Sequence, residues 1–254
     1  MQDRKMQRIE IFEKNKELYN FYQDFLHFSK AVVVDEQNSL LKLSNTKKSN
    51  SWNISWNQKK SLEDIPHEDT AVLVFSSAKS PGGGILRGSS AQEEDISLVS
   101  SWYFQVKDIQ NFYDSKNSNA LNTSKILLIE KGYVFLDEYM QEIKNPYSLS
   151  LIGCAAPNLK GMLEQKQDIS LVYSEYQKRL KNILVLAENL QKKNLVLGAW
   201  GCGVFGLDPQ KIANIFSNEI HQNYFSGNII MNIPNVILLN QFKEFFSKKP
   251  LLRK

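Results

Sequence analysis

The sequence predicts an α/β fold in which helices cover both faces of a central sheet that is largely parallel or mixed. Short β-branched runs of strand type alternate along the chain with longer stretches whose apolar residues recur every three or four positions. Glycine-rich segments follow two of the short apolar runs, at residues 82–84 and 201–206. Loops of this kind lie at the carboxyl ends of strands, where α/β sheets bind their ligands.

Length and composition indicate one globular unit with an extension. The 254 residues are 42% hydrophobic and 23% charged, which is enough apolar material for a sizeable core. We expect an N-terminal helical extension and loop over residues 1–65, packing on a main domain over residues 66–254. The net charge of +4 is too small to indicate nucleic-acid binding.

Cysteine and histidine usage argues against metal and thiol chemistry. Cys154, Cys202 and three scattered histidines show no metal-ligand spacing, so we expect neither a metal nor a cofactor. No signal peptide or run of membrane-spanning length is visible. We therefore expect a cytoplasmic monomer that does not bind membranes, with export as an effector the alternative location.

The N-terminal third predicts a helix followed by irregular structure. Apolar residues recur at helical spacing over 4–28, which favours one or two amphipathic helices packed on the body over a helix that binds a partner or a membrane surface. Residues 31–34 are of strand type, and 44–60 read as a loop with one edge strand. We expect Trp52 and Trp56 to pack on the core rather than to stack nucleobases.

Strands and helices then alternate to the C-terminus. Strand-type runs cover 71–75, 147–157, 195–200 and 227–233, together with a pair at 125–129 and 133–135 that a turn at Lys131-Gly132 would join, and a last run at 236–239. Helical spacing covers residues 96–103, continues over 104–113 and recurs over 174–191. Asp208-Pro209 is a typical N-cap and first residue of a further helix.

The segment 201–206 matches the dinucleotide-binding pattern Gly-x-Gly-x-x-Gly, but its position argues against that function. The pattern lies near the C-terminus, and no clear second strand ending in Asp or Glu follows at the required distance. The sequence therefore argues against a nicotinamide-dependent dehydrogenase.

The segment Pro81-Gly82-Gly83-Gly84 carries more information. Glycine loses more backbone freedom on folding than any other residue, so a triple glycine indicates positive φ or close approach of another group. Backbone N–H groups of such a turn can bind an anion. Gln92-Glu93-Glu94 then fall at the start of the next helix, where acidic residues either cap the helix or act in catalysis.

The triple glycine followed by Ala91-Gln92-Glu93-Glu94 resembles the motif of bacterial poly(ADP-ribose) glycohydrolases, members of the macrodomain group. Residues 197–209 resemble that family's second phosphate loop. The resemblance runs from about residue 70 to the 230s and implies a macrodomain-like three-layer α/β/α sandwich with a mixed sheet. The sequence departs from the family at Val74 and Ser80, where relatives tend to carry asparagine.

The resemblance also implies roles. Glu94 would be the general acid and then the base that activates water, Glu93 would bind the leaving ribose, and Gln92 would order the pair. The substrate-binding residues would include Gly82, Gly83, Gly84, Gly201, Cys202, Gly203, Val204 and Phe205. The ligands would be ADP-ribose and poly(ADP-ribose), including chains carried on ADP-ribosylated proteins.

Residue chemistry limits this interpretation. Neighbours on a helix point about 100° apart, so Glu93 and Glu94 cannot flank one glycosidic bond symmetrically. One glutamate should therefore act on the bond while the other orients the sugar. Two other functions stay open at this stage: an ADP-ribose reader without turnover, and a hydrolase for mono-ADP-ribose on protein or nucleic acid.

Overall fold

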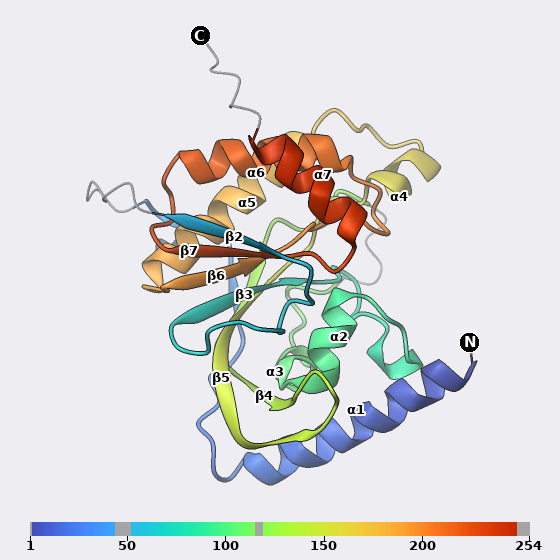
Figure 1. Ribbon diagram of the computed structural model, residues 1–254. Coiled ribbons are helices and arrows are strands. Elements are labelled where there is room, and N and C mark those ends of the chain that lie inside the picture. The colour runs from blue at the N-terminus through green and yellow to red at the C-terminus, as the bar shows by residue number, and fades with distance from the viewer. Residues whose placement is uncertain (1, 44–51, 115–118, 248–254) are drawn as a thin grey trace.

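The computed structural model describes residues 2–43, 52–114 and 119–247. Within these ranges seven strands form one mixed sheet in the order β1-β4-β5-β3-β6-β7-β2 (Figure 1). The central strand β3 runs parallel to β5 and β6, while β4 is antiparallel to β5 and β1. The strands are β1 (Val32–Val34), β2 (Asn53–Asn57), β3 (Thr70–Phe75), β4 (Ile126–Leu136), β5 (Glu142–Cys154), β6 (Asn194–Leu197) and β7 (Asn228–Asn232).

Helices cover both faces of this sheet, which confirms the predicted three-layer α/β/α architecture (Figure 1). One face carries α1 (Gln2–Tyr22), α2 (Gln92–Val99) and α3 (Trp102–Val106). The other carries α4 (Leu159–Glu164), α5 (Val172–Asn189), α6 (Pro209–His221) and α7 (Val236–Ser247). Two short 3₁₀ turns, η1 (Ser39–Leu41) and η2 (Ile85–Arg87), lie in connecting segments.

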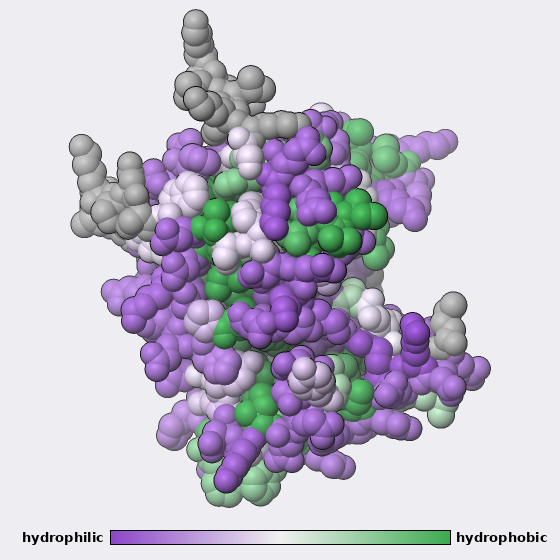
Figure 2. Space-filling model, viewed as in Figure 1, coloured by the Kyte–Doolittle hydropathy of each residue, from purple (hydrophilic) through white to green (hydrophobic). Residues whose placement is uncertain are grey.

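Strand β3 shows why the sheet needs both layers. Successive side chains of a strand point to opposite faces. Ala71 and Leu73 pack in the cluster beneath α5, whereas Val72 and Val74 pack in the cluster beneath α2. All four are buried, so β3 has no solvent-facing side, as expected for a central parallel strand. Polar residues cover most of the molecular face seen in Figure 2, and apolar residues show there as separate patches.

The N-terminal 65 residues contribute to both edges of the sheet. Strand β1 pairs with β4 at one edge and β2 pairs with β7 at the other, so the predicted edge strand within 44–60 is present. Residues 44–51 of that predicted loop lie outside the described ranges. Trp52 and Trp56 are half-buried against the core beneath α5, which confirms their predicted packing. Within the described ranges, none of the helices has the length and apolarity that a membrane crossing requires.

The predicted turn at Lys131-Gly132 is wrong, because β4 runs continuously from Ile126 to Leu136. A register shift between Ile129 and Gly132 absorbs the irregularity instead. A Cβ on Gly132 would lie 2.6 Å from the Leu151 side chain, so glycine permits the close approach of β5 at this bulge.

Two other predicted elements are also wrong. The helix after the glycine motif breaks at Ser100-Ser101, and α3 ends at Val106 instead of continuing to Tyr113. Residues 236–239 begin α7 rather than a strand. Leu239 and Phe242, three positions apart, form its buried face, and the Asn235 side chain accepts from the Leu238 N–H at its start. Four consecutive apolar residues resemble a strand when this helical continuation is overlooked.

Candidate active site

A cavity of about 1060 Å³ opens at the carboxyl ends of β3, β6 and β7. This is the edge at which open α/β sheets bind ligands. Its wall includes residues from both predicted glycine loops and the predicted glutamate pair: Gly83, Gln92, Glu93, Glu94, Gly201, Gly203, Val204 and Phe205. Gly82 and Gly84 are buried behind that wall, and Cys202 also lies outside it.

The first glycine loop holds a carboxylate of the same chain. Gly82 and Gly83 both have φ of +62°, which L side chains rarely adopt. The Gly84 N–H donates to Glu94 Oε1 at 2.7 Å, and the Gly83 N–H donates to the Ser80 carbonyl at 3.0 Å. A Cβ on Gly83 would lie 2.5 Å from Glu94 Oε1. These internal bonds occupy the N–H groups of Gly83 and Gly84.

Glu93 is the more enclosed of the two glutamates, with 3% of its surface exposed. Oε2 accepts from the Ser77 N–H at 2.7 Å, and Oε1 accepts from Ser76 Oγ and Trp102 Nε1, both at 3.2 Å. Burial raises the pKa of Glu93 to about 8, which outweighs the opposing effect of these donors, and the neighbouring Glu94 raises it further. Glu93 is therefore a fixed carboxyl group that holds its proton near neutral pH.

Glu94 is differently placed. It is 8% exposed and lines the cavity, and its Oε1 accepts the Gly84 N–H. Its Oε2 has no hydrogen-bond partner among the described residues. One oxygen thus orients the carboxyl group, and the other is left for a ligand. The pair consequently has the asymmetry expected when one carboxyl acts and the other positions.

Gln92 connects the glutamate pair to the sheet. Strands β3 and β6 pair only through Thr70–Val72 and Asn194–Val196. Beyond that point the Gln92 side chain accepts from the Phe75 N–H at 2.8 Å and donates to the Leu73 carbonyl at 2.7 Å. It also donates to Ser61 Oγ at 2.9 Å. The amide therefore extends the β-ladder and fixes the first turn of α2 against β3.

The second glycine loop has the geometry of an anion site. Gly201 and Gly206 have φ of +82° and +71°, and the Gly206 N–H donates to the Gly203 carbonyl. Among the described residues, the N–H groups of Gly203, Val204 and Phe205 have no acceptor. A Cβ on Gly203 would meet nothing within 4 Å. Consecutive free N–H groups in an open turn are suited to phosphate oxygens.

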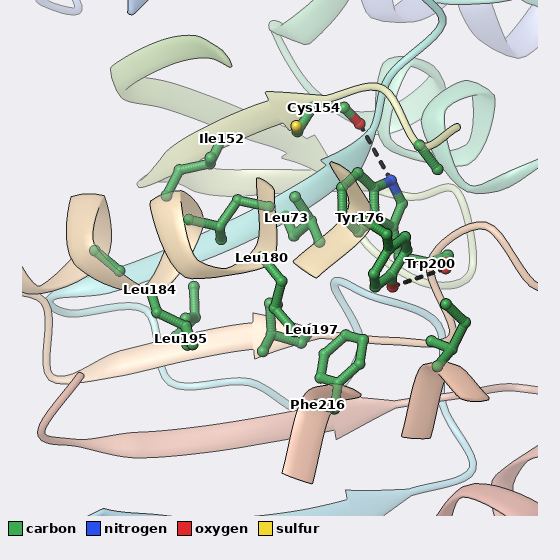
Figure 3. Packing of buried hydrophobic residues seen from close by; sticks show 14 of the residues in the cluster. Leu73, Ile152, Cys154, Tyr176, Leu180, Leu184, Leu195, Leu197, Trp200 and Phe216 are labelled. Atoms are coloured by element: carbon green, nitrogen blue, oxygen red, sulfur yellow. Dashed lines mark hydrogen bonds between the residues drawn. The ribbon is translucent and has the colours of Figure 1, made fainter. Parts of the chain in front are cut away.

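Two side chains of α5 hold the strand ends that form this wall. Tyr176 donates its hydroxyl to the Trp200 carbonyl at 2.9 Å, and Trp200 Nε1 donates to the Cys154 carbonyl at 3.2 Å (Figure 3). One helical turn further on, Arg179 donates to the Ala155 carbonyl at 2.8 Å. Sequence reasoning assigned Tyr176 only to a core-facing helix. Nothing in its spacing could indicate a bond to a loop 24 residues away.

The two cysteines are poorly suited to nucleophilic chemistry. Burial raises the pKa of Cys154 and of Cys202 to about 12, so neither is a reactive thiolate at neutral pH. Among the described residues, no group of three His, Cys, Asp or Glu side chains could hold a metal ion. Val74 is buried beneath α2 and lies outside the cavity wall. Phe205 both lines the cavity and packs, half-buried, on the core.

Fold and site together define a macrodomain-type α/β protein: a mixed sheet between helical layers, with a carboxyl pair and a glycine loop with free N–H groups on one cavity. A family model described as "Microbial-type PARG, catalytic domain" matches residues 4–135, a segment that includes the glutamate pair. The chain therefore belongs to the microbial-type PARG catalytic-domain family, the glycosidases of poly(ADP-ribose). A search among curated proteins found no match.

Solved structures agree with this assignment. The poly(ADP-ribose) glycohydrolase from Thermomonospora curvata is 20% identical, covers 94% of this chain and 99% of its own, and superposes with a TM-score of 0.83. A second structure of that enzyme, bound to the inhibitor ADP-HPD, gives a TM-score of 0.79 over the same shares at 20% identity. The Deinococcus radiodurans enzyme in complex with ADP-ribose is 26% identical, covers 77% of this chain and 84% of its own, and gives 0.70.

Proposed function

We propose that this chain hydrolyses the ribose–ribose O-glycosidic bond of poly(ADP-ribose) and releases ADP-ribose, with Glu94 as the general acid and base. The observation that carries the proposal is the free Oε2 of Glu94 on a cavity that also presents the unpaired N–H groups of Gly203, Val204 and Phe205. One ligand that carries a diphosphate and a ribose would engage both features.

The diphosphate would bind the second glycine loop, where N–H groups and the local backbone dipoles favour negative charge. Held there, the ribose C1″ would be oriented toward α2 before any bond breaks, and such positioning lowers the barrier substantially. Glu94 would protonate the leaving oxygen as the oxocarbenium-like transition state develops. It would then take a proton from the water that attacks C1″.

Glu93 has a different part. Its carboxyl group is fixed by Ser76, Ser77 and Trp102 and keeps its proton near neutral pH. Once Glu94 has donated its proton, a neutral carboxyl beside it avoids the repulsion of two adjacent carboxylates. It would bind a ribose hydroxyl and so orient the sugar against Glu94.

Purified protein and labelled poly(ADP-ribose) test the proposal directly. We expect wild type to release ADP-ribose and Glu94→Gln to lose about 10²- to 10⁴-fold in rate while it still binds ADP-ribose. Glu10→Gln, the same change at an exposed site on α1, should behave as wild type. If wild type leaves the polymer intact but binds ADP-ribose tightly, the result would refute turnover and favour an ADP-ribose reader. Cleavage confined to mono-modified protein would refute the polymer as substrate.

A further inference from the structure

Arg8 on α1 contacts the chain on both sides of the glutamate pair. Its Nε donates to the Ser89 carbonyl at 2.9 Å, and its Nη1 lies 2.8 Å from Asp95 Oδ1. Ser89 precedes the glutamates and Asp95 follows Glu94 directly. The Arg8 side chain is 16% exposed and that of Asp95 25%, so the ion pair is largely shielded from water. We propose that Arg8 is a positioning residue for Glu94, an inference that rests on the proposed function.

A short chain of contacts links Arg8 to the Glu94 carboxyl group. Arg8 holds the Ser89 carbonyl, and the Ser89 N–H donates to the Gly84 carbonyl at 3.2 Å. The Gly84 N–H in turn donates to Glu94 Oε1 at 2.7 Å. From the other side, Arg8 holds Asp95, the next residue along the helix. The guanidinium therefore fixes both the loop that orients the carboxyl group and the backbone that carries it.

The rest of α1 supports this arrangement. A Cβ on Gly88 would lie 2.5 Å from the Lys5 carbonyl oxygen, so the loop after the triple glycine packs directly on the α1 backbone. Asn15, fully buried, donates to the Ser97 and Ser100 carbonyls at 3.0 and 2.8 Å and so holds the end of α2. Helix α1 passes beneath α2 along this line (Figure 1).

Lysine cannot replace arginine here. The guanidinium donates a hydrogen bond to the Ser89 carbonyl through Nε while Nη1 forms the ion pair with Asp95, whereas an ammonium is a single point charge on a flexible stem. Lys60 Nζ lies 3.4 Å from Asp95 Oδ2 and would remain as the cation partner of Asp95. Loss of Arg8 would therefore move Asp95 toward Lys60 and release Ser89. A displacement of about 1 Å at a reacting group costs on the order of 10²-fold in rate.

The test measures kcat and KM on poly(ADP-ribose), the Kd of ADP-ribose and the melting temperature for Arg8→Lys and Arg8→Gln. We expect kcat to fall about 10- to 100-fold in both variants, with the Kd of ADP-ribose within about 3-fold of wild type, because Arg8 is not part of the cavity wall that includes the second glycine loop. Lys16→Gln removes an exposed cation from the same helix and should keep wild-type kcat. Unchanged kcat in the Arg8 variants, or a parallel loss of kcat and ADP-ribose binding, would overturn the proposal.

A double-mutant cycle separates positioning from general destabilisation. Asp95→Asn keeps the side-chain volume and removes the charge. Because Arg8 and Asp95 act through one contact, Arg8→Gln combined with Asp95→Asn should lower kcat little more than Arg8→Gln does. If the two substitutions instead lower kcat by independent factors that multiply, the proposed role of the Arg8–Asp95 contact is overturned. Absence of turnover in wild type would instead refute the proposed function itself, so the two failures are distinguishable.

Discussion

Replacing Glu93 with glutamine should change how the stability of the protein depends on pH. The Glu93 carboxyl is 3% exposed, and burial raises its pKa to about 8 in the folded chain. In the unfolded chain the same carboxyl is solvated and titrates near its ordinary value of about 4.3. The folded state therefore binds a proton more tightly than the unfolded state does.

The sign and size follow from proton linkage. Between about pH 4.3 and pH 8 the unfolded chain has lost a proton that the folded chain still holds, so the free energy of unfolding falls as pH rises. The full stability is present below the unfolded pKa and is lost by the time pH passes the folded pKa. The slope reaches about 1.4 kcal/mol per pH unit, and the total is on the order of 5 kcal/mol.

Urea unfolding between pH 5 and pH 9 measures this effect. The free energy of unfolding of wild type should fall across the range, and that of Glu93→Gln should fall less by an amount approaching the total above. Glu10→Gln removes an exposed carboxyl on α1 and should follow wild type. Parallel profiles for wild type and Glu93→Gln would show that Glu93 is ionised in the folded protein and would refute the reasoning.

Three further substitutions test the loops. Gly83→Ala would place a Cβ 2.5 Å from Glu94 Oε1 at a φ of +62°, so kcat on poly(ADP-ribose) should fall on the order of 10²-fold. Gly206→Ala, at a φ of +71° with its nearest contact at 3.5 Å, should lower the free energy of unfolding by about 1 kcal/mol from backbone strain alone, as urea unfolding would measure. Tyr176→Phe removes the hydrogen bond to the Trp200 carbonyl, and calorimetry should show weaker ADP-ribose binding. An unchanged Kd would show that this hydrogen bond does not hold the second glycine loop in place for binding.

Much of the fold was visible in the sequence because it depends on local pattern. Residues 71–75 are apolar without alternation, and the structure places them in a strand buried on both faces. The helix predicted over 174–191 is α5, and Asp208-Pro209 caps and begins α6. The prediction failed at 131–132 because a glycine is common both in a turn and in a β-bulge. It failed at 236–239 because a short apolar run is compatible with both a strand and a helix.

The candidate site was only partly predictable. Triple glycine and the glutamate pair stand close together in the sequence, so their proximity could be anticipated. Sequence alone could not show which loop N–H groups have an acceptor within the chain. The Gly84 N–H donates to Glu94, whereas the N–H groups of Gly203, Val204 and Phe205 have no acceptor among the described residues. The donors to Glu93, among them Trp102, and the tether from Tyr176 likewise depend on where separate elements meet.

By itself, then, the sequence determined the layered α/β architecture, the two glycine turns and the presence of adjacent acidic groups, because backbone propensity and apolar spacing act over a few residues. Only the tertiary structure decided which glutamate is more enclosed and which has a free carboxyl oxygen. It alone also placed Arg8 of α1 in contact with Ser89 and Asp95, on either side of the glutamate pair. Burial, pKa and hydrogen-bond partners depend on elements far apart in the chain, and short-range pattern does not specify how those elements pack.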